Sequence, residues 1–491
     1  MSASVAELFE GLDARVDGPA RNPVGDLTYD SRAVRPGALF AALRGAKTDG
    51  HRFLAQAIEQ GASALLVEEP PAARPAQVAV VRVADTRAAL ADVAARFFGH
   101  PGRALTLVGV TGTNGKTSTV RMIESILTAA GRSTGSLSTV TARWPGHEEK
   151  SSLTTPESLD LQRSLARMRD AGVVAAVVEV SSHSLALGRV RGLRFAAGVF
   201  THLSQDHLDF HADMESYGNA KGKLFGAEYL AGTAVLNAAD PWSKRFAESA
   251  RAAGRAVRTY ARGADAQADF RTIAERVELS GSRLRVRGPD GETEVALPLP
   301  GDFQIENALA ALAAGHALGV GWDALRRGLE SCPPVPGRLE RVGRERPIVL
   351  VDYAHTPDAL DRVLARVRPL VPGRLIAVFG CGGDRDRTKR APMARAACAH
   401  AQHVIATSDN PRTEDPDAIL RDIAAGLSGS HEVVRDRRQA IERAIELAGP
   451  DDCVVIAGKG HEDYQIVGSE RRAFDDREEA RRALRARGVA A

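Results

Sequence analysis

The segment LTLVGVTGTNGKTSTVRMIESIL, residues 105–127, constrains the fold of this chain more than any other segment does. It is typical of a β-strand, a glycine-rich turn and an amphipathic helix, in that order. The glycines allow backbone NH groups to approach an anion, Lys116 can reach terminal phosphates, and the Thr117 hydroxyl can bind Mg²⁺. Val110 stands where the strict pattern GxxxxGK[ST] has its first glycine. The strand before and the helix after nevertheless favour a phosphate loop over an ordinary strand-to-helix turn.

The length and charge of the chain narrow its class. A chain of 491 residues predicts about three domains, and 65 basic against 62 acidic residues give a net charge of only +3. This balance argues against a nucleic-acid or membrane-surface partner. The N-terminus lacks the features of a signal peptide, and no apolar run is long enough to span a membrane. We therefore expect a cytoplasmic protein without membrane insertion, whose four cysteines are reduced thiols.

Strand and helix patterns alternate along the chain, which predicts an α/β fold with parallel sheets. FFGHPGR marks one boundary near residue 102, and the three prolines of SCPPVPGRLE mark another near residue 336. The expected domains are therefore residues 1–102, 103–336 and 337–491.

Two further apolar segments end in polar residues that are able to bind metal or substrate. VVAAVVEVSSHSLALGRV ends its strand at Glu179, and AAGVFTHLSQDHLDFH is followed by Asp206, His207, Asp209 and His211. In open α/β sheets, ligands bind beyond the carboxyl ends of strands, so Glu179 is placed to share a Mg²⁺ ion with Thr117. A solvated strand-end glutamate and a plain surface loop are the alternatives.

The helical segment ESYGNAKGKLFG carries two lysines only two residues apart. At about 100° per residue, Lys221 falls among the apolar positions, whereas Lys223 points away from them. A buried ammonium needs an anion, a lowered pKa or a covalent change that removes its charge. An ion pair with Asp206 or Asp209 is the simpler explanation at this point.

Ordered motifs along nearly the whole chain resemble the Mur ligase family, the ATP-dependent amide-bond-forming enzymes of peptidoglycan precursor synthesis. They are GVTGTNGKTST, EVSSHSLALGRV, LSQDHLDFHADMESYGNAKGKLF, GDFQIENALAALA, PGRLERV, VDYAHTPDAL, FGCGGDRDRTKR, SDNPRTEDP and AGKGHEDYQ. The last three resemble the members that add meso-diaminopimelate to the D-Glu γ-carboxylate of UDP-MurNAc-L-Ala-D-Glu. The resemblance implies an N-terminal uridine-binding α/β domain, a central P-loop ATPase-like domain with a mostly parallel sheet, and a C-terminal Rossmann-like domain.

The resemblance also implies the ATP and metal residues. Lys221 is expected to be carbamylated by CO₂ and to hold a second Mg²⁺ with Glu179 and His207, while Thr117 holds the first. Gln304 departs from the asparagine that is more frequent in the family. The ATP-binding residues implied are Gly112, Thr113, Asn114, Gly115, Lys116, Thr117, Ser118, Asn307, Arg338, Asp352 and His355.

Two substrate pockets follow from the same matching. Leu187 and Leu153 replace polar residues of some relatives, and TTP by itself would be read as a helix N-cap. The residues implied for the UDP-substrate are Tyr29, Ser31, Ala46, Lys47, Thr48, Thr154, Thr155, Ser181, Leu187 and Arg189. Those implied for diaminopimelate are Arg385, Asp409, Asn410, Pro411, Arg412, Gly458 and Glu462.

Arg412 bears on the choice of amino acid. Diaminopimelate differs from lysine by one carboxylate, which a planar guanidinium recognises through two hydrogen bonds. Glu462 is expected to take the ammonium at the far chiral centre. A lysine-adding enzyme would gain nothing from Arg412, so the sequence favours meso-diaminopimelate.

Two other functions are weighed against this one. A folylpolyglutamate synthase-like ligase would share the phosphate loop and the modified lysine, but the N-terminal domain and DNPR disfavour it. A regulatory protein that hydrolyses ATP without ligation is disfavoured because Glu179, His207, Lys221 and the amino-acid pocket are all present. We expect a monomer that uses small-molecule substrates and binds no nucleic acid.

Overall fold

The computed structural model of the protein describes residues 2–45, 48–343 and 345–489. The chain forms two compact units. The first comprises Met1–Arg271, Arg287–Glu292 and Asn307–Gly328. The second comprises Thr272–Val286, Thr293–Glu306 and Leu329–Ala491.

A five-stranded sheet forms the N-terminal part of the first unit. Alternate residues of its strand β5 enter different cores: Leu39 and Ala41 pack with α3, whereas Phe40 packs with α2 on the other face. The strand order is β2 (Arg15–Asp17), β7 (Ala79–Arg82), β6 (Ala64–Val67), β5 (Ala38–Ala41) and β4 (Asp26–Thr28), and only β2 is antiparallel to its neighbour. The helices are α1 (Val5–Phe9), α2 (Leu54–Glu59) and α3 (Thr86–Phe97), and β1 (Ala3–Ser4) pairs with β3 (Pro23–Val24).

The sheet that carries the phosphate loop is larger and mostly parallel. Its central strand β8 (Thr106–Thr111) pairs in parallel with β12 (Ala175–Glu179) on one side and with β13 (Phe195–Phe200) on the other. Beyond β12 lie β9 (Thr134–Leu137), β10 (Thr141–Trp144) and β11 (His147–Lys150). Beyond β13 lie β14 (Leu230–Asn237) and β15 (Ala256–Ala261), and then β16 (Phe270–Glu278), β17 (Gly281–Gly288) and β18 (Gly291–Leu297), whose residues are divided between the two units.

Helices connect these strands and bury their apolar faces. Leu161, Leu165 and Met168 of α5 and Phe246 of α8 belong to one hydrophobic core with Leu107 of β8. The helices are α4 (Lys116–Ala129), α5 (Ser158–Asp170), α6 (Ser182–Ala186), α7 (Met214–Gly222), α8 (Trp242–Ala252), α9 (Phe303–Ala317) and α10 (Trp322–Glu330).

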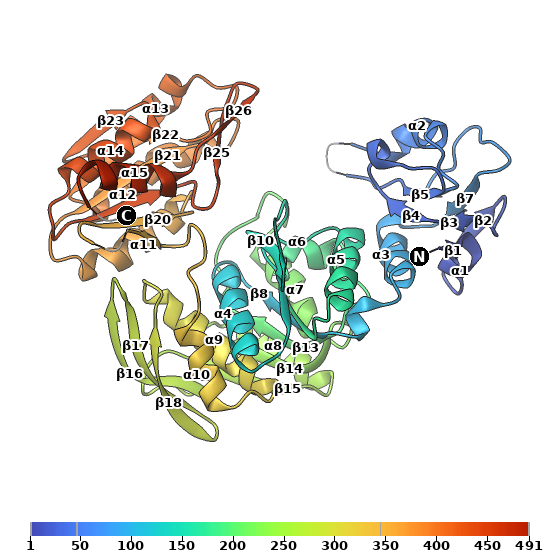
Figure 1. Cartoon of the computed structure of the whole chain (residues 1–491), viewed down its shortest axis with the longest axis horizontal. Coiled ribbons are helices and arrows are strands. Elements are labelled where there is room, and N and C mark those ends of the chain that lie inside the picture. The colour runs from blue at the N-terminus through green and yellow to red at the C-terminus, as the bar shows by residue number, and fades with distance from the viewer. Residues whose placement is uncertain (1, 46–47, 344, 490–491) are drawn as a thin grey trace. The chain divides into compact units, whose positions relative to one another are not determined.

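The second unit contains a six-stranded sheet with helices on both faces (Figure 1). The strand order is β19 (Glu340–Val342), β20 (Ile348–Asp352), β24 (Cys453–Ala457), β21 (Leu375–Cys381), β22 (His403–Ser408) and β23 (His431–Val434), and only β19 is antiparallel to its neighbour. One core holds α11 (Pro357–Val367), α12 (Arg390–His400) and α13 (Pro416–Ala424), and the other holds α14 (Arg437–Leu447) and α15 (Asp476–Ala486). A hairpin of β25 (Tyr464–Val467) and β26 (Glu470–Ala473) follows β24.

These sheets confirm the predicted α/β fold class with a mostly parallel central sheet. The domain boundaries at residues 102 and 336 stay a prediction. No helix in the described part of the chain combines the length and apolar character needed to cross a membrane.

A fully buried ion pair joins two helices of the second unit. Arg437, the first residue of α14, donates to both carboxylate oxygens of Asp476, the first residue of α15, at 2.7 and 2.6 Å. The same guanidinium donates to Ser408 O at 3.2 Å and Ala457 O at 3.0 Å, at the ends of β22 and β24. The pair therefore holds two strand ends as well as two helices.

We expect Asp476→Ala to lower the free energy of unfolding by about 3–5 kcal/mol, because it removes the carboxylate that is paired with the buried charge of Arg437. Denaturant unfolding followed by circular dichroism measures the change. Glu432→Ala is the matched control, because its ion pair with Arg443 is half-exposed and should contribute about 1 kcal/mol or less. Equal losses in the two variants would contradict this account.

Candidate active site

The phosphate loop predicted from the sequence runs from the end of β8 to the start of α4. Its glycines adopt backbone angles that other residues rarely take: φ is +146° at Gly112 and +85° at Gly115. A Cβ on Gly112 would lie 1.8 Å from Thr201 Oγ1, and one on Gly115 would lie 2.4 Å from Asn307 Oδ1. Thr113 N donates to His202 O at 2.8 Å, so the loop is held against the chain that follows β13.

Neighbouring side chains also hold the loop. Thr201 Oγ1 donates to Asn114 O at 2.7 Å, and Thr113 Oγ1 lies 3.2 Å from the Tyr217 hydroxyl. Asn307, on α9, accepts from Thr119 Oγ1 at 3.4 Å. Asn307, one of the predicted ATP-binding residues, therefore lies beside the phosphate loop within the first unit. Ser118 and Thr117 are buried in the first turn of α4.

Two lysine side chains meet at one backbone carbonyl of the loop. Lys116 Nζ donates to Gly112 O at 3.0 Å and to Thr113 O at 2.8 Å, and Lys221 Nζ donates to the same Gly112 O at 2.8 Å. Lys221 is only 1% exposed, and its ammonium lies 4.4 Å from the centre of the Tyr217 ring. Among the described residues it forms no ion pair, so the simpler expectation of a salt bridge with Asp206 or Asp209 is not met.

Lys221, in α7, and Lys223, which follows α7, differ as the helical phase predicts. Lys221 is buried and Lys223 is exposed, although α7 ends at Gly222 and Lys223 begins a short 3₁₀ turn. Burial lowers the pKa of Lys221 well below its ordinary value, and the nearby positive charge of Lys116 lowers it further. Asp206 opposes this shift. Burial and Lys116 therefore both favour the neutral amine of Lys221 over its ammonium form.

Glu179 lies at the carboxyl end of β12, one strand away from the phosphate loop, in register with Val110. Its carboxylate is completely buried and accepts from Thr139 N at 3.0 Å and from Thr139 Oγ1 at 2.9 Å. A solvated strand cap, the alternative considered for this residue, is thus excluded by its burial.

Several residues predicted to bind the UDP-substrate form one network around this strand end. Thr155 Oγ1 donates to Glu179 O at 2.7 Å, Ser181 N donates to Thr155 Oγ1 at 3.1 Å, and Arg189 donates to Thr155 O at 3.0 Å. Thr154 Oγ1 lies 3.1 Å from Thr139 Oγ1, within hydrogen-bond distance. Leu187 is the C-cap residue of α6, which Ser181 caps at its start.

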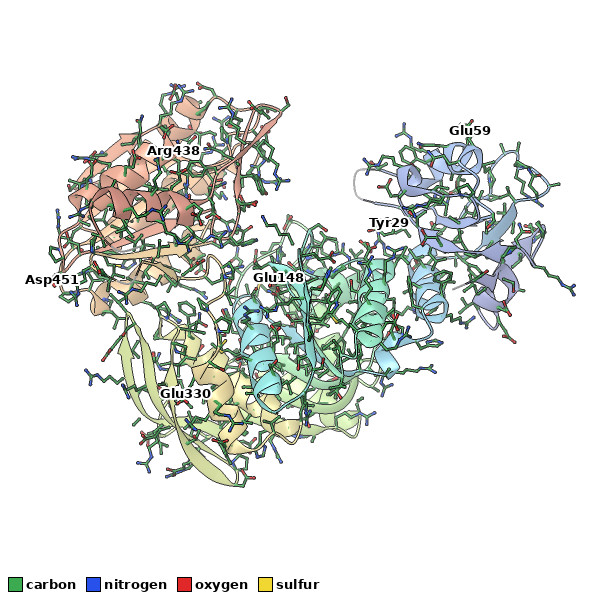
Figure 2. The ribbon with its side chains drawn as sticks, viewed as in Figure 1. Tyr29, Glu59, Glu148, Glu330, Arg438 and Asp451 are labelled. Carbon is green, nitrogen blue, oxygen red and sulfur yellow. The ribbon has the colours of Figure 1, made fainter. Side chains whose placement is uncertain are left out.

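Tyr29, Ser31 and Thr48, the described N-terminal members of this set, lie outside the strands of the five-stranded sheet, and Tyr29 directly follows β4. The hydroxyl of Tyr29 (labelled in Figure 2) donates to Asp160 Oδ2 at 2.5 Å. Ser31 is buried at the start of a short 3₁₀ helix. Thr48 O accepts from Gly45 N at 2.9 Å, whereas Ala46 and Lys47 lie outside the described residues.

Three imidazoles gather beside α7. The His183 ring lies 4.8 Å from that of His207 and 5.6 Å from that of His211, and it stacks on Phe210 at 4.1 Å. Burial, aided by the other two histidines, lowers the pKa of His183 to about 4. The pKa of His207 is lowered mainly by burial as well. These rings are therefore neutral at neutral pH and have nitrogen lone pairs available.

The described residues contain no cluster of three or more His, Cys, Asp or Glu side chains that is suited to hold a metal. The predicted metal set has only two residues of these types, Glu179 and His207. Lys221 would have to carry an added carboxylate, and Thr117 would contribute a hydroxyl. The metal set therefore stays a prediction.

A second group of predicted residues comes together in the second unit, where β24, β21 and β22 lie side by side. Asn410 Nδ2 donates to Glu462 Oε2 at 3.0 Å, which joins the loop after β22 to the loop after β24. A Cβ on Gly458, where φ is +118°, would lie 2.9 Å from Asp409 Oδ2. Asp409, Asn410 and Pro411 are all buried.

The two arginines of this group lie on adjoining loops. Arg412 has φ of +54° and donates from Nη1 to Gly383 O at 2.7 Å. Arg385, two residues beyond Gly383, is exposed. Thr413 Oγ1 donates to Asp384 Oδ1 at 2.8 Å, so the loops that carry the two guanidinium groups are linked.

The three remaining residues predicted for ATP surround the end of β20. Asp352 accepts from Leu339 N and Ala354 N, both at 2.8 Å, and burial raises the pKa of its carboxyl group. The Arg338 guanidinium lies 4.8 Å from the centre of the Tyr353 ring, and His355 is exposed. The predicted ATP residues are thus divided: these three belong to the second unit, whereas Asn307 belongs to the first.

Sequence reasoning missed two features of this site. Lys459 is completely buried and contacts Asn410 and Glu462. Arg437 and Asp476 hold the strand ends that carry the predicted amino-acid residues. A lysine between glycines in the strand-end motif AGKGHED was an available signal for the first, whereas nothing local indicates the second.

Family models match three consecutive parts of the chain. They are Mur ligase family, catalytic domain (residues 24–98), Mur ligase middle domain (residues 110–315) and Mur ligase, glutamate ligase domain (residues 337–460).

Individual proteins are similar over much greater lengths. A protein of Gloeobacter violaceus named UDP-N-acetylmuramoyl-L-alanyl-D-glutamate--2,6-diaminopimelate ligase is 50% identical over 467 residues, 94% of each chain. A solved structure with the same name is 34% identical, with a TM-score of 0.73 and full coverage of both chains. Folylpolyglutamate synthase of Mycobacterium tuberculosis is 23% identical with a TM-score of 0.61, covering 76% of this chain and 92% of the other, and this likeness concerns the fold alone.

We expect Gly112→Ala to weaken ATP binding at least about tenfold, because the added methyl group meets Thr201 Oγ1 and distorts the loop. Calorimetric titration with a non-hydrolysable ATP analogue measures the affinity. Gly131→Ala is the matched control: its φ is also positive, at +78°, but a Cβ there meets nothing within 4 Å. Wild-type affinity in the Gly112 variant would show that this loop does not bind the nucleotide.

Proposed function

We propose that this chain, which belongs to the Mur ligase family, joins meso-2,6-diaminopimelate to the D-Glu γ-carboxylate of UDP-MurNAc-L-Ala-D-Glu in an ATP-dependent reaction. The observation that carries this proposal is the 50% identity, over 94% of both chains, to a relative named as that ligase. The phosphate loop and the Arg412 and Glu462 group are the features such an activity needs. The enzyme acts as a cytoplasmic monomer on small molecules, in peptidoglycan precursor synthesis, and binds no nucleic acid.

The phosphate loop activates the carboxylate. A carboxylate is a poor electrophile, so the γ-phosphoryl group of ATP moves to one of its oxygens, which gives an acyl phosphate and ADP. The diaminopimelate amine then attacks the acyl carbon; phosphate leaves, the amine loses a proton, and the amide remains. Lys116 and the backbone NH groups of Gly112–Ser118 stabilise the negative charge on the transferred group. Asn307, Arg338, Asp352 and His355 bind the rest of the nucleotide.

The residues around Lys221 fit Mg²⁺ if this lysine is carbamylated. Its amine is buried, has a lowered pKa and forms no ion pair with the described residues, which are the conditions in which a neutral amine adds to CO₂. The addition forms an N–C bond, releases one proton and leaves a carboxylate beside Lys116. Glu179, His207 and this carboxylate would hold one ion, and Thr117 the other. Bound Mg²⁺ supplies positive charge opposite the phosphoryl oxygens.

The second unit selects the amino acid. Arg412, aided by Arg385, binds the carboxylate that distinguishes diaminopimelate from lysine, and Glu462 binds the ammonium at the same end. The rest of the amino-acid pocket is lined by Asp409, Asn410, Pro411 and Gly458. In the first unit, the UDP-substrate is bound by Tyr29, Ser31, Ala46, Lys47, Thr48, Thr154, Thr155, Ser181, Leu187 and Arg189.

A phosphate-release assay tests the function. With ATP, Mg²⁺ and UDP-MurNAc-L-Ala-D-Glu present, we expect release to require meso-diaminopimelate and to be much slower with L-lysine. A folate substrate with glutamate should give no release, which separates this enzyme from the folate ligases that share its fold. Release without any amino acid would indicate the regulatory ATPase, and equal rates with lysine would refute the choice of substrate.

Lys221→Ala should reduce the ligation rate at least about a hundredfold, because the metal-binding carboxylate can no longer form. Lys223→Ala is the matched control: this side chain is exposed, and the rate should stay within about twofold. Steady-state kinetics measures both variants, and ¹³C NMR with labelled bicarbonate detects the carbamate in the wild type only. Equal losses in the two variants would contradict the assigned role.

A further inference from the structure

Lys459 is a buried cation to which the proposed reaction assigns no role. It follows β24 and Gly458, and its side chain has no exposed surface. Its Nζ lies 3.3 Å from Asn410 Oδ1 and 3.4 Å from Glu462 Oε2, and 5.4 Å from the centre of the Tyr464 ring. An ammonium at such depth is costly unless a nearby anion compensates its charge, and Glu462 is the carboxylate within reach.

The hydrogen bonds that the Glu462 carboxylate accepts from the described residues all fall on one of its two oxygens. Its Oε2 accepts from Lys459 Nζ and, at 3.0 Å, from Asn410 Nδ2. Its Oε1 receives no hydrogen bond from the described residues, and the side chain is 21% exposed. One oxygen is thus held in place by two donors, while the other is left to accept from a ligand.

Further hydrogen bonds hold the loops that carry this pair. Asn410 Oδ1, besides contacting Lys459, accepts from Ile466 N at 2.9 Å, and Glu462 N donates to Lys459 O at 2.9 Å. The buried guanidinium of Arg437 ties the ends of β22 and β24, the strands that precede these residues. Lys459 and Glu462 therefore lie in a hydrogen-bonded loop that follows an anchored strand end, unlike a surface ion pair between two long, mobile side chains.

We propose that Lys459 is a positioning residue for the amino-acid substrate. It holds one oxygen of Glu462 and compensates part of the buried negative charge, so that the other oxygen accepts a hydrogen bond from the substrate ammonium. Lys459 itself touches neither the substrate nor the reacting atoms. This inference rests on the proposed function. A lysine ordinarily repels an ammonium group, but here it would help to bind the substrate ammonium through Glu462.

Steady-state kinetics of Lys459→Met tests the proposal, because methionine fills a similar volume without charge. We expect the KM for diaminopimelate to rise about tenfold or more, the usual scale for losing a hydrogen bond to a charged group, while the KM for ATP and for the UDP-substrate changes less than about twofold. An unchanged KM for diaminopimelate, or equal rises for all three substrates, would overturn it. Arg472→Met, which removes an exposed charge from β26, is the matched control and should leave all three values unchanged.

A double-mutant cycle separates positioning from a general structural effect. If Lys459 acts through Glu462, adding Lys459→Met to Glu462→Gln should raise the KM for diaminopimelate by less than about twofold beyond the single Glu462 variant. Full multiplication of the two effects would show that the residues act independently and would overturn the proposal. If Lys459→Met does not fold, Lys459→Gln enters the same cycle with the same criteria.

Phosphate release by the wild-type enzyme distinguishes a failure of the proposed function from a failure of the Lys459 role. If the wild type shows no diaminopimelate-dependent phosphate release, the proposed function fails, and the role of Lys459 fails with it. If the wild type is active while Lys459→Met keeps a normal KM for diaminopimelate, only the positioning role fails.

Discussion

The parallel pairing of β8 with β12 and β13 is the constraint on which the phosphate-loop site depends. Parallel neighbours end at the same edge of a sheet, so the segments that follow them are close in space. Glu179 ends β12 in register with Val110, and Phe200 ends β13 in register with Thr111. The loop after β8 is consequently held by Thr201 and His202, which come directly after β13. The conformation of this loop therefore depends on how β8 pairs with its two neighbouring strands. The glycines allow that conformation but do not by themselves produce it.

Buried charges form a second organising element. Lys221 is buried beside the phosphate loop with a backbone carbonyl as its acceptor, whereas Lys459 is buried beside a carboxylate and an amide. The first arrangement lowers the pKa of the amine, which supports the proposed carbamylation. The second pairs Lys459 with Glu462, whose carboxylate it is proposed to position. Two buried lysines of one chain thus have opposite chemical consequences, which their neighbours determine.

The sequence predicted the structure correctly where the pattern lies within one short segment of the chain. The strand, loop and helix of residues 105–127 were predicted in order, and the helical phase of ESYGNAKGKLFG identified Lys221 as the buried lysine. The phase succeeded although α7 stops at Gly222, because Tyr217 and Lys221 are one helical turn apart. The ion pair suggested for Lys221 was wrong, since a nearby acidic residue in the sequence does not establish the direction in which a side chain points.

The sequence by itself determined the alternation of strands and helices, the glycines of the phosphate loop, and the side of α7 that faces the core. These properties follow from backbone angles and from periods of two to four residues. Only the tertiary structure decided which charges compensate one another: Lys221 contacts a carbonyl 109 positions away, Lys459 an amide 49 away, and Arg437 a carboxylate 39 away. Such partners are chosen by the order of strands in a sheet, and strand order is set by packing between distant segments, which no local pattern records.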